Sequence, residues 1–570
     1  MFGVSTLLAL AAGLAQCQAQ FNNPPGVDIW CGKAYRATNA SFNPGGWFVE
    51  PEKSSVPLLN FKVKPRMNLY LDGEESGSLL VDASISDLVG QPFTSSTGSS
   101  SAVEGTDLLV DIFLDGKSSL LAERTTVSIG DSAEIVFDLS GFSARLEPYN
   151  ITAIATLAQD NSTTFTANTQ FSKLPLRTDN GTVTRLDNLY GGLSVRRADS
   201  TTFQPIFPYT YYVQWSLYWY ANLSTLDEFS SLGYNLIHIV PTGDLGDDPF
   251  PWEAFQPYLD RAAQLGLFFQ YDVRWDPSNL TTMRDQVSRL ASHPSILLWY
   301  TGDEPDGKSN PTNSTRLAYD AIRALDPYHP VSLALNCYDF YYADYAAGAE
   351  IILSDVYPVS TNTSWSTVYE TPCNATYGCC GCDDCNGAFE DISDRLDVFA
   401  HRDEVLGWQK THWGAPQAFG NETFWTRYPT AAEEVAMNLL SVNHGAKGLV
   451  MWNFPVTQDI LRATNELAAV LTAEEVGAYL IGAPLTSGLV VSGAERVDAA
   501  AWVADGGVLV SVVNLNYGSV AGNITVRLPE GVDVRAVGQS LWGEAEWSVS
   551  GSAISIGGLA GLEVSLVELK

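Results

Sequence analysis

The segment ILLWYTGDEP, residues 296–305, joins a continuous run of apolar and aromatic residues to an acidic turn. A short apolar run that is bounded by turn residues is typical of a strand buried on both faces. The run ends at Gly302, and Asp303, Glu304 and Pro305 follow directly, so two carboxylates stand at the end of the predicted strand. This segment therefore predicts a buried parallel strand and a candidate site at its carboxyl end.

Seven further segments of this kind lie between residues 203 and 480 and alternate with amphipathic stretches. Eight strand–helix units in about 270 residues predict a (β/α)8 TIM barrel. An open doubly wound sheet is the alternative, which we disfavour because no glycine-rich phosphate loop follows the first strand. The other strands are YTYYVQW (209–215), NLIHIVP (235–241), LFFQYDV (267–273), VSLALNC (331–337), IILSDVYP (351–358), the segment ending in PQAFG (416–420), and GLVMWNF (448–454).

Helix boundaries between these strands are also visible. WEAFQPYLDRAAQLG predicts an amphipathic helix that ends at its last glycine, Gly266. Thr430 and Glu433 predict a capping box for a later helix, and Ser224 with Asp227 predicts a similar start for the first helix.

The segments that flank the barrel have β character, with alternating or β-branched runs separated by Gly, Ser, Asp and Asn. Examples are DLLVDIFLDG (107–116) before the barrel and GVLVSVVNLN (507–516) after it. We therefore predict a multidomain chain that combines an α/β barrel with all-β domains. Its parts are a signal peptide at 1–19, an N-terminal β-sandwich at 20–200, a catalytic barrel at 201–482 and a C-terminal β-sandwich at 483–570.

The N-terminus and the charge indicate an exported protein. An apolar run from Val4 to Leu14 is too short to span a bilayer and precedes a cleavage site at Cys17–Ala19. We expect no membrane anchor, and a secreted location outside the cell or in the cell wall. The net charge of −34 disfavours nucleic acid and polyanionic substrates. Eleven Asn-x-Ser/Thr sequons fit a glycoprotein: Asn39, Asn150, Asn161, Asn180, Asn222, Asn279, Asn313, Asn362, Asn374, Asn421 and Asn523.

Five of the eight cysteines lie in the segment CNATYGCCGCDDC, residues 373–385. Cys382 and Cys385 could form half of a zinc site or a redox pair, but in an exported protein we favour a disulfide-bonded loop. If Cys17 leaves with the signal peptide, seven cysteines remain, so one is left over. The sequence does not assign the pairing.

In a barrel of this type the functional residues come from the carboxyl ends of the strands. The candidates for catalysis are Glu304 and Asp303. Polar and aromatic residues of this kind around one rim suit a carbohydrate substrate. No zinc motif, phosphate loop or serine-hydrolase elbow is present, so we expect no metal and no cofactor. The candidates for substrate binding are Trp215, Asp272, Asn336, Asp355, Tyr357, Gln417, Trp452 and Asn453.

The chain resembles the (β/α)8 glycoside hydrolases, over residues 203–480. In the large clan of retaining barrel glycosidases, strand 4 commonly closes with Asn-Glu and often Pro, and the resemblance implies that Glu304 is the acid/base. The chain differs from that clan in two places. Asp303 stands where the clan has Asn, and strand 7 is predicted to end on Gln417, where the clan carries its nucleophile.

The Asp-Glu pair also resembles the β-N-acetylhexosaminidases, which use the acetamido oxygen of the substrate as nucleophile. That resemblance implies that Asp303 polarises the acetamide and that Glu304 protonates the leaving oxygen. It also implies that Tyr357 binds the acetamido group and that Trp452 walls the pocket. Neighbours on a strand point to opposite faces, so both carboxylates reach one pocket only if the strand breaks near Gly302.

Three functions are consistent with these features. We favour a glycosidase that cleaves O-glycosidic bonds of an oligo- or polysaccharide at a chain end. The alternatives are a non-catalytic carbohydrate-binding or cell-wall protein on a barrel scaffold, and a transglycosidase. If Asp303 is not the second carboxylate, Asp355 and Asp272 are the next candidates. The oligomeric state is not predicted.

Overall fold

The computed structural model describes residues 29–34, 45–93, 105–114, 119–273, 277–374, 377 and 380–570. They form two compact units, described one at a time. One unit contains the barrel, the C-terminal sheets and the described residues up to Phe48. The sequence placed these residues before Val49 in the N-terminal sandwich instead. The other unit contains Val49–Gln204 and His401–Lys410. The predicted signal peptide, the sequon at Asn39 and Cys379 lie outside the described residues.

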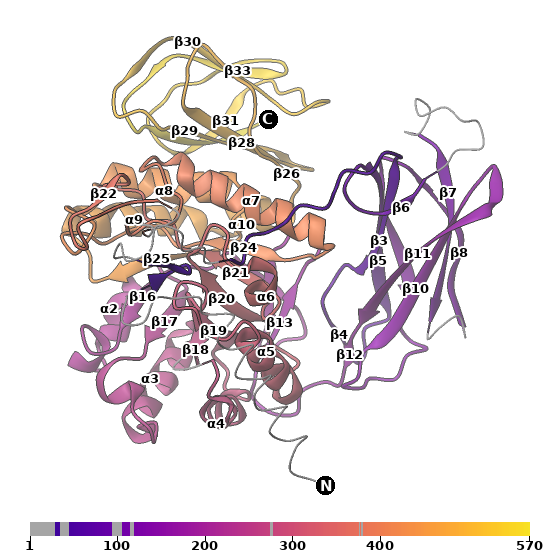
Figure 1. Ribbon diagram of the computed structural model, residues 1–570, viewed down its shortest axis with the longest axis horizontal. Coiled ribbons are helices and arrows are strands. Elements are labelled where there is room, and N and C mark those ends of the chain that lie inside the picture. The colour runs from indigo at the N-terminus through magenta and orange to yellow at the C-terminus, as the bar shows by residue number, and fades with distance from the viewer. Residues whose placement is uncertain are drawn as a thin grey trace. The chain divides into compact units, whose positions relative to one another are not determined.

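Eight parallel strands close into a barrel in the order predicted from the sequence (Figure 1). The last strand pairs with the first, so the sheet has no free edge and the alternative of an open sheet is excluded. The central residues of these strands are buried, as continuous apolar runs require. The strands are β16 (Tyr209–Gln214), β17 (Leu236–Val240), β18 (Phe268–Asp272), β19 (Ile296–Asp303), β20 (Val331–Leu335), β21 (Ile351–Ser354), β24 (Thr411–Gly414) and β25 (Leu449–Phe454).

Helices connect the barrel strands. Gly266 ends α3 in the left-handed conformation, and Thr430 forms the predicted capping box with Glu433. Ser224 precedes α2 but makes no side-chain cap, so that part of the prediction was wrong. The helices are η1 (Trp219–Ala221), α2 (Thr225–Ser231), η2 (Gly243–Gly246), α3 (Trp252–Leu265), α4 (Leu280–Leu290), α5 (Ser314–Leu325), α6 (Tyr342–Ala346), α7 (Glu390–Leu406), α8 (Ala431–Asn443), α9 (Gln458–Leu471) and α10 (Glu474–Gly482).

Strand 7 differs from its prediction. It is β24, with the sequence THWG, and it ends before the PQAFG segment. Gln417 follows three residues later and makes only an isolated bridge to Trp452. The apolar side chains of PQAFG are buried in the connection after the strand, which is why composition alone did not separate the two.

The C-terminal residues of the same unit form two antiparallel sheets around an apolar core that includes Leu489, Val510, Ile524 and Trp547. One sheet has the order β26 (Leu485–Thr486), β28 (Val497–Ala504), β29 (Gly507–Asn514), β34 (Val564–Leu569) and β31 (Val537–Trp542). The other has the order β27 (Val491–Ser492), β30 (Val520–Arg527), β33 (Ala553–Leu559) and β32 (Ser548–Ser550).

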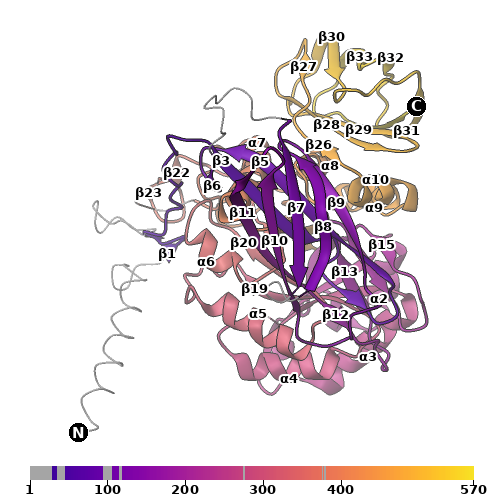
Figure 2. The same ribbon diagram turned by 90° about the vertical axis from the view of Figure 1, so that its right-hand side faces the viewer.

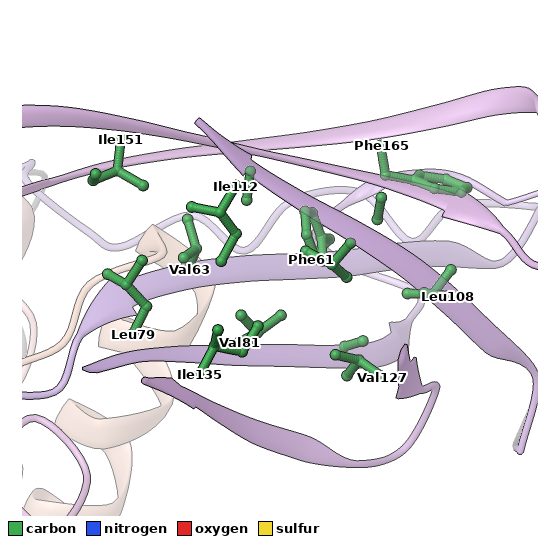
Figure 3. Close-up of a cluster of buried hydrophobic side chains, with 14 of the residues drawn as sticks. Phe61, Val63, Leu79, Val81, Leu108, Ile112, Val127, Ile135, Ile151 and Phe165 are labelled. Atoms are coloured by element: carbon green, nitrogen blue, oxygen red, sulfur yellow. The ribbon is translucent and has the colours of Figure 1, made fainter. Parts of the chain in front are cut away.

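The second unit is also built from two four-stranded antiparallel sheets (Figure 2). Side chains of both sheets, among them Phe61, Val81, Leu108 and Ile112, meet in one buried cluster (Figure 3). The first sheet has the order β6 (Gln91–Pro92), β3 (Leu58–Pro65), β5 (Ser76–Ser86) and β9 (Ser132–Asp138). The second has the order β11 (Asp160–Phe171), β10 (Tyr149–Leu157), β7 (Asp107–Leu114) and β8 (Ser119–Ser128).

Short strands complete the fold. Within the described part of the chain, no helix has the length and apolar character needed to cross a bilayer. The short strands are β1 (Ile29–Trp30), β2 (Lys33–Ala34), β4 (Tyr70–Leu71), β12 (Lys173–Leu174), β13 (Val183–Leu186), β14 (Leu193–Arg196), β15 (Gln204–Ile206), β22 (Trp365–Ser366) and β23 (Thr371–Pro372).

Candidate active site

A cavity of about 320 Å³ lies at the carboxyl ends of the barrel strands. That volume is at the lower end of the range for small-molecule sites. Four carboxyl groups and seven aromatic rings face it, which gives the cavity both proton donors and flat apolar walls. The lining residues are Trp30, Asp303, Glu304, Asn336, Asp355, Tyr357, Tyr369, Gly381, Phe419, Glu422, Phe424, Trp425 and Trp452.

Asp303 and Glu304 both reach this cavity because β19 is irregular at its end. The pairing of β19 with β20 shifts register between Tyr300 and Gly302. Glu304 then takes a left-handed backbone conformation, with φ of 52°. This break replaces the strict alternation of a strand, in which neighbours would face opposite sides.

Asp303 is held by two neighbours. Its Oδ2 pairs with Lys308 Nζ at 2.8 Å, and its Oδ1 accepts a hydrogen bond from the Tyr300 hydroxyl at 3.0 Å. The Tyr212 hydroxyl donates in turn to the Tyr300 hydroxyl at 3.2 Å. These contacts fix the orientation of the Asp303 carboxylate on the cavity wall.

Glu304 lies against Asn336 and Asp355. Its Oε1 accepts a hydrogen bond from Asn336 Nδ2 at 3.1 Å, and its carboxyl group shares a hydrogen bond with that of Asp355. The pKa of Glu304 is raised to about 7, chiefly by burial and then by the charge of Asp303, with a smaller contribution from Asp306; Lys308 and the Asp355 hydrogen bond oppose the rise. Glu304 is therefore poised to hold a proton at mildly acidic pH and to release it near neutrality.

Asp355 is buried immediately after β21. Burial raises the pKa of its carboxyl well above the ordinary value, and the charges of Glu304 and Asp303 add to that rise. One proton shared between Glu304 and Asp355 satisfies the hydrogen bond between them, because two ionised carboxylates would repel each other.

Asp306 organises the backbone beneath these groups. Its Oδ1 accepts from the backbone N–H of Gly307 and of Asn336, at 2.8 and 3.3 Å, and its Oδ2 accepts from the N–H of Cys337 at 2.8 Å. Burial raises the pKa of Asp306 to about 6, against the effect of these three hydrogen bonds. Asp306 thus ties the loop after β19 to the end of β20.

A further part of the cavity wall comes from the loops that follow strands 6 and 7. Disulfides link Cys373 to Cys380 and Cys382 to Cys385, so the last pair is neither a zinc site nor a free dithiol. Gly381, between the two disulfides, has φ of 95°, and a Cβ there would lie 2.9 Å from atoms of Phe424 and Trp425. The cysteine-rich loop and the aromatic loop therefore pack closely at this glycine.

Six predicted site residues line the cavity together, namely Asp303, Glu304, Asn336, Asp355, Tyr357 and Trp452. Four others do not line it. Trp215 is 2% exposed and packs on Tyr258, and Asp272 is buried in contact with His238 Nε2 at 3.1 Å. Gln417 is buried and bonds to the backbone of Val359, while Asn453 is partly exposed beside Trp452. The site that we propose omits these four.

Seven lining residues were missed: Trp30, Tyr369, Gly381, Phe419, Glu422, Phe424 and Trp425. Four of them lie in the segment FGNETFW that follows strand 7, and its aromatic density beyond a strand end was a usable signal. Trp30 lies more than 250 residues before β19 and β20, whose ends form the cavity with it, and no local sequence pattern indicates this position.

Comparison with known proteins gives distant structural likenesses. No family model matches the chain, and no curated protein matches it by sequence. Among solved structures, a maltogenic α-amylase from Thermotoga neapolitana is 10% identical, with 63% of this chain and 98% of that chain covered and a TM-score of 0.42. A debranching enzyme from Nostoc punctiforme is 12% identical, with 61% and 88% covered and a TM-score of 0.39.

An FMN-binding β-glucuronidase from Facaelibacterium prausnitzii L2-6 is 11% identical, with 90% of this chain and 70% of that chain covered and a TM-score of 0.33. TM-scores this low support no conclusion about activity. The barrel assignment rests on the strand pairing of the chain itself.

Proposed function

We propose that this chain is an exported glycoside hydrolase that removes a terminal sugar, with Glu304 as the general acid/base. One observation carries the proposal: a carboxyl group with a pKa of about 7 faces a small aromatic cavity at the active end of a (β/α)8 barrel. Catalytic acids need a pKa near the working pH, and burial together with neighbouring carboxylates supplies that rise here.

The other lining groups suit the same reaction. Glycoside cleavage passes through an oxocarbenium-like transition state, which needs a proton on the leaving oxygen and negative charge near the ring. Glu304 supplies the proton. Trp425 and Trp452 offer flat faces for the apolar side of a sugar ring, and the carboxylate of Asp303 lies on the same cavity.

The partner carboxylate is Asp303 in this proposal. Asp355 shares a hydrogen bond with Glu304, which places the two carboxyls closer than the separation of about 5 Å found in retaining acid–nucleophile pairs. Asp303, fixed by Lys308, is available to orient the acetamido group of an N-acetylhexosamine, which then attacks the anomeric carbon itself. Glu422 lines the same cavity and is the alternative partner, as a base or nucleophile from the protein.

Charge and sequence support a proposal for the substrate and the location. The four carboxyl groups on the cavity wall disfavour an anionic sugar, so we propose an uncharged hexose derivative, with an N-acetylhexosamine first. The small cavity favours the end of a glycan over its interior. The predicted signal peptide, the sequons and the three disulfides support a secreted location.

The test is hydrolysis of a panel of aryl glycosides, including N-acetylglucosaminides and N-acetylgalactosaminides, by wild type and by Glu304→Gln. Loss of the carboxylic acid should lower kcat at least about 100-fold. Glu253→Gln, on the exposed first turn of α3, is the matched control and should leave activity unchanged. Unchanged activity of Glu304→Gln would contradict the proposal.

Two further variants assign the partner. Asp303→Asn should lower kcat on N-acetyl sugars strongly, to a small but measurable rate, if the acetamide is the nucleophile. Glu422→Gln should have that effect instead if the protein supplies the second carboxylate. Wild-type protein that binds glycans but hydrolyses none of the panel would support the carbohydrate-binding alternative. Products longer than the substrate would support a transglycosidase.

A further inference from the structure

The short hairpin of β1 and β2 lies at the mouth of the barrel. Cys31 lies in the turn of this hairpin, and a disulfide joins it to Cys337, just after β20 and 306 residues later in the sequence. The backbone N–H of Cys31 donates to the carbonyl oxygen of Gly307 at 3.3 Å. The hairpin is thus attached to the two loops, after β19 and β20, that carry Glu304 and Asn336.

A buried ion pair attaches the hairpin at a second point. Lys33 Nζ lies 2.6 Å from Asp383 Oδ1 and 3.1 Å from Asp384 Oδ1, and the side chains of Lys33 and Asp383 are 3% and 1% exposed. A buried pair of this kind is stable only when its geometry is well fixed. The hairpin therefore bridges the end of β20 and the cysteine-rich loop.

Trp30, at the tip of β1, points into the cavity and contacts Asn336. Its indole Nε1 donates a hydrogen bond to Asn336 Oδ1 at 2.6 Å. An indole N–H is only a donor, so the Asn336 amide must present its oxygen to Trp30 and its NH2 group to Glu304. The backbone of Asn336 is also clamped, because its N–H donates to Asp306 and its carbonyl oxygen accepts from Arg395.

The indole ring fits against bare backbone at Gly307. A Cβ at this glycine would lie 2.7 Å from ring atoms of Trp30, which is closer than any real contact. The ring therefore occupies a place that only glycine leaves open. The structure provides the room, the hydrogen bond and the covalent tether for one orientation of Trp30.

We infer that Trp30 is a positioning residue of the active site, which acts through Asn336 to hold an amide N–H toward Glu304, and that its ring forms part of the sugar-binding wall. This inference rests on the proposed function of Glu304. It assigns an active role to a hairpin that lies far from the barrel in sequence.

The proton equilibrium of Glu304 should report this role. An N–H donor directed at a carboxyl oxygen favours its ionised form, whereas an amide oxygen in that place favours the protonated form. Without the indole N–H, the Asn336 amide loses the donor that holds its oxygen away from Glu304, and apart from Glu304 its Nδ2 keeps a long hydrogen bond to the carbonyl oxygen of Asp355 at 3.5 Å. The alkaline limb of the pH–rate profile should then move to higher pH. The other groups that act on Glu304 remain in place: Asp303, Asp306, Lys308, Asp355 and Tyr357.

The experiment is a double-mutant cycle with Trp30→Phe and Asn336→Ala, measured as kcat, KM and the pH profile of kcat/KM. Trp30→Phe keeps an aromatic ring and removes the N–H, so kcat should fall about fivefold to tenfold, with the alkaline limb displaced upward. On the Asn336→Ala background the same change should alter kcat less than about twofold, because the partner is already gone. Trp365→Phe, at an exposed tryptophan outside the cavity, is the control and should leave the profile unchanged.

Three outcomes are informative. Additive effects of the two variants, or an unmoved alkaline limb in Trp30→Phe, would overturn the inference while leaving Glu304 as the acid/base. Activity that survives Glu304→Gln would remove the proposed function instead. Replacement of both Cys31 and Cys337 by Ser removes the covalent attachment of the hairpin without changing the cavity wall, and should displace the limb upward by a smaller amount, because the Lys33–Asp383 ion pair remains. An undisplaced limb in that folded variant also counts against the inference.

Discussion

Charge substitutions next to Glu304 should move the pH dependence of the enzyme in opposite directions. Asp303 raises the pKa of Glu304, and Lys308 lowers it. Asp303→Asn should therefore shift the alkaline limb of kcat/KM to lower pH, and Lys308→Met should shift it to higher pH. Neither change removes the proton donor, so residual rates remain measurable in both variants.

The structure sets the size of the effect. The pKa of Glu304 rises from 4.5 to about 7, which is worth about 3 kcal/mol between the two protonation states. At pH 6 a carboxyl with a pKa of 7 is about 90% protonated, whereas one at 4.5 is only about 3% protonated. Burial is the largest cause and Asp303 the second, so Asp303→Asn should move the limb part of the way from 7 toward 4.5.

The effect of Lys308 should be smaller. Its side chain is 45% exposed, and solvent and salt screen such a charge. The assay is initial rates on the best aryl glycoside between pH 3 and pH 9, at low and high salt. Two results would refute this account of Glu304: shifts of the same sign in both variants, or a wild-type kcat/KM that has already finished its alkaline decrease by pH 5.

Two further predictions concern parts of the molecule outside the carboxylates. Burial lowers the pKa of His444, but hydrogen bonds to Asp397 and Asp498 raise it to about 9. These contacts should therefore add up to about 3 kcal/mol to the free energy of unfolding below pH 6.5, and this contribution should disappear as the pH rises through 9. His444→Gln should flatten that dependence in chemical denaturation, and an unchanged slope would contradict it. Gly381→Ala places a Cβ against Trp425 in a strained backbone conformation, so KM should rise while the alkaline limb of kcat/KM changes little. An unchanged KM in a folded variant would argue against an aromatic binding wall.

The barrel could be predicted because its evidence is local. Most strands are runs such as ILLWYTG that are buried on both faces, and helices such as α3 have their own apolar stripe and end signal. Strand 7 was the exception, since THWG is only four residues long and the apolar PQAFG segment follows it. A short strand next to a buried connection carries too little pattern to be separated from it.

The site was predictable only in part. The rule that function lies at the carboxyl ends of the strands brings Glu304, Asn336 and Asp355 together correctly, because the closed sheet forces those ends onto one rim. The same rule cannot tell which strand-end side chains face the cavity. Asp272 ends its strand as expected and yet turns into a buried contact with His238. The role of Trp30 depends on a contact across 306 residues, and no local pattern in the sequence indicates a contact at that distance.

The placement of the disulfides explains how such a site is stabilised. All three described disulfides lie on the rim, and the barrel strands themselves contain none. In the chain-entropy model, the Cys31–Cys337 bond closes a loop of about 306 residues and disfavours the unfolded chain by about 5 to 6 kcal/mol, against about 2 kcal/mol for each of the short bonds. The long bond therefore holds the hairpin and Trp30 in place, while the short bonds shape the loop around Gly381. The barrel is stabilised by its own buried strands, whereas the rim consists of short, irregular segments, and the disulfides give these segments covalent support that keeps Glu304 in a fixed environment.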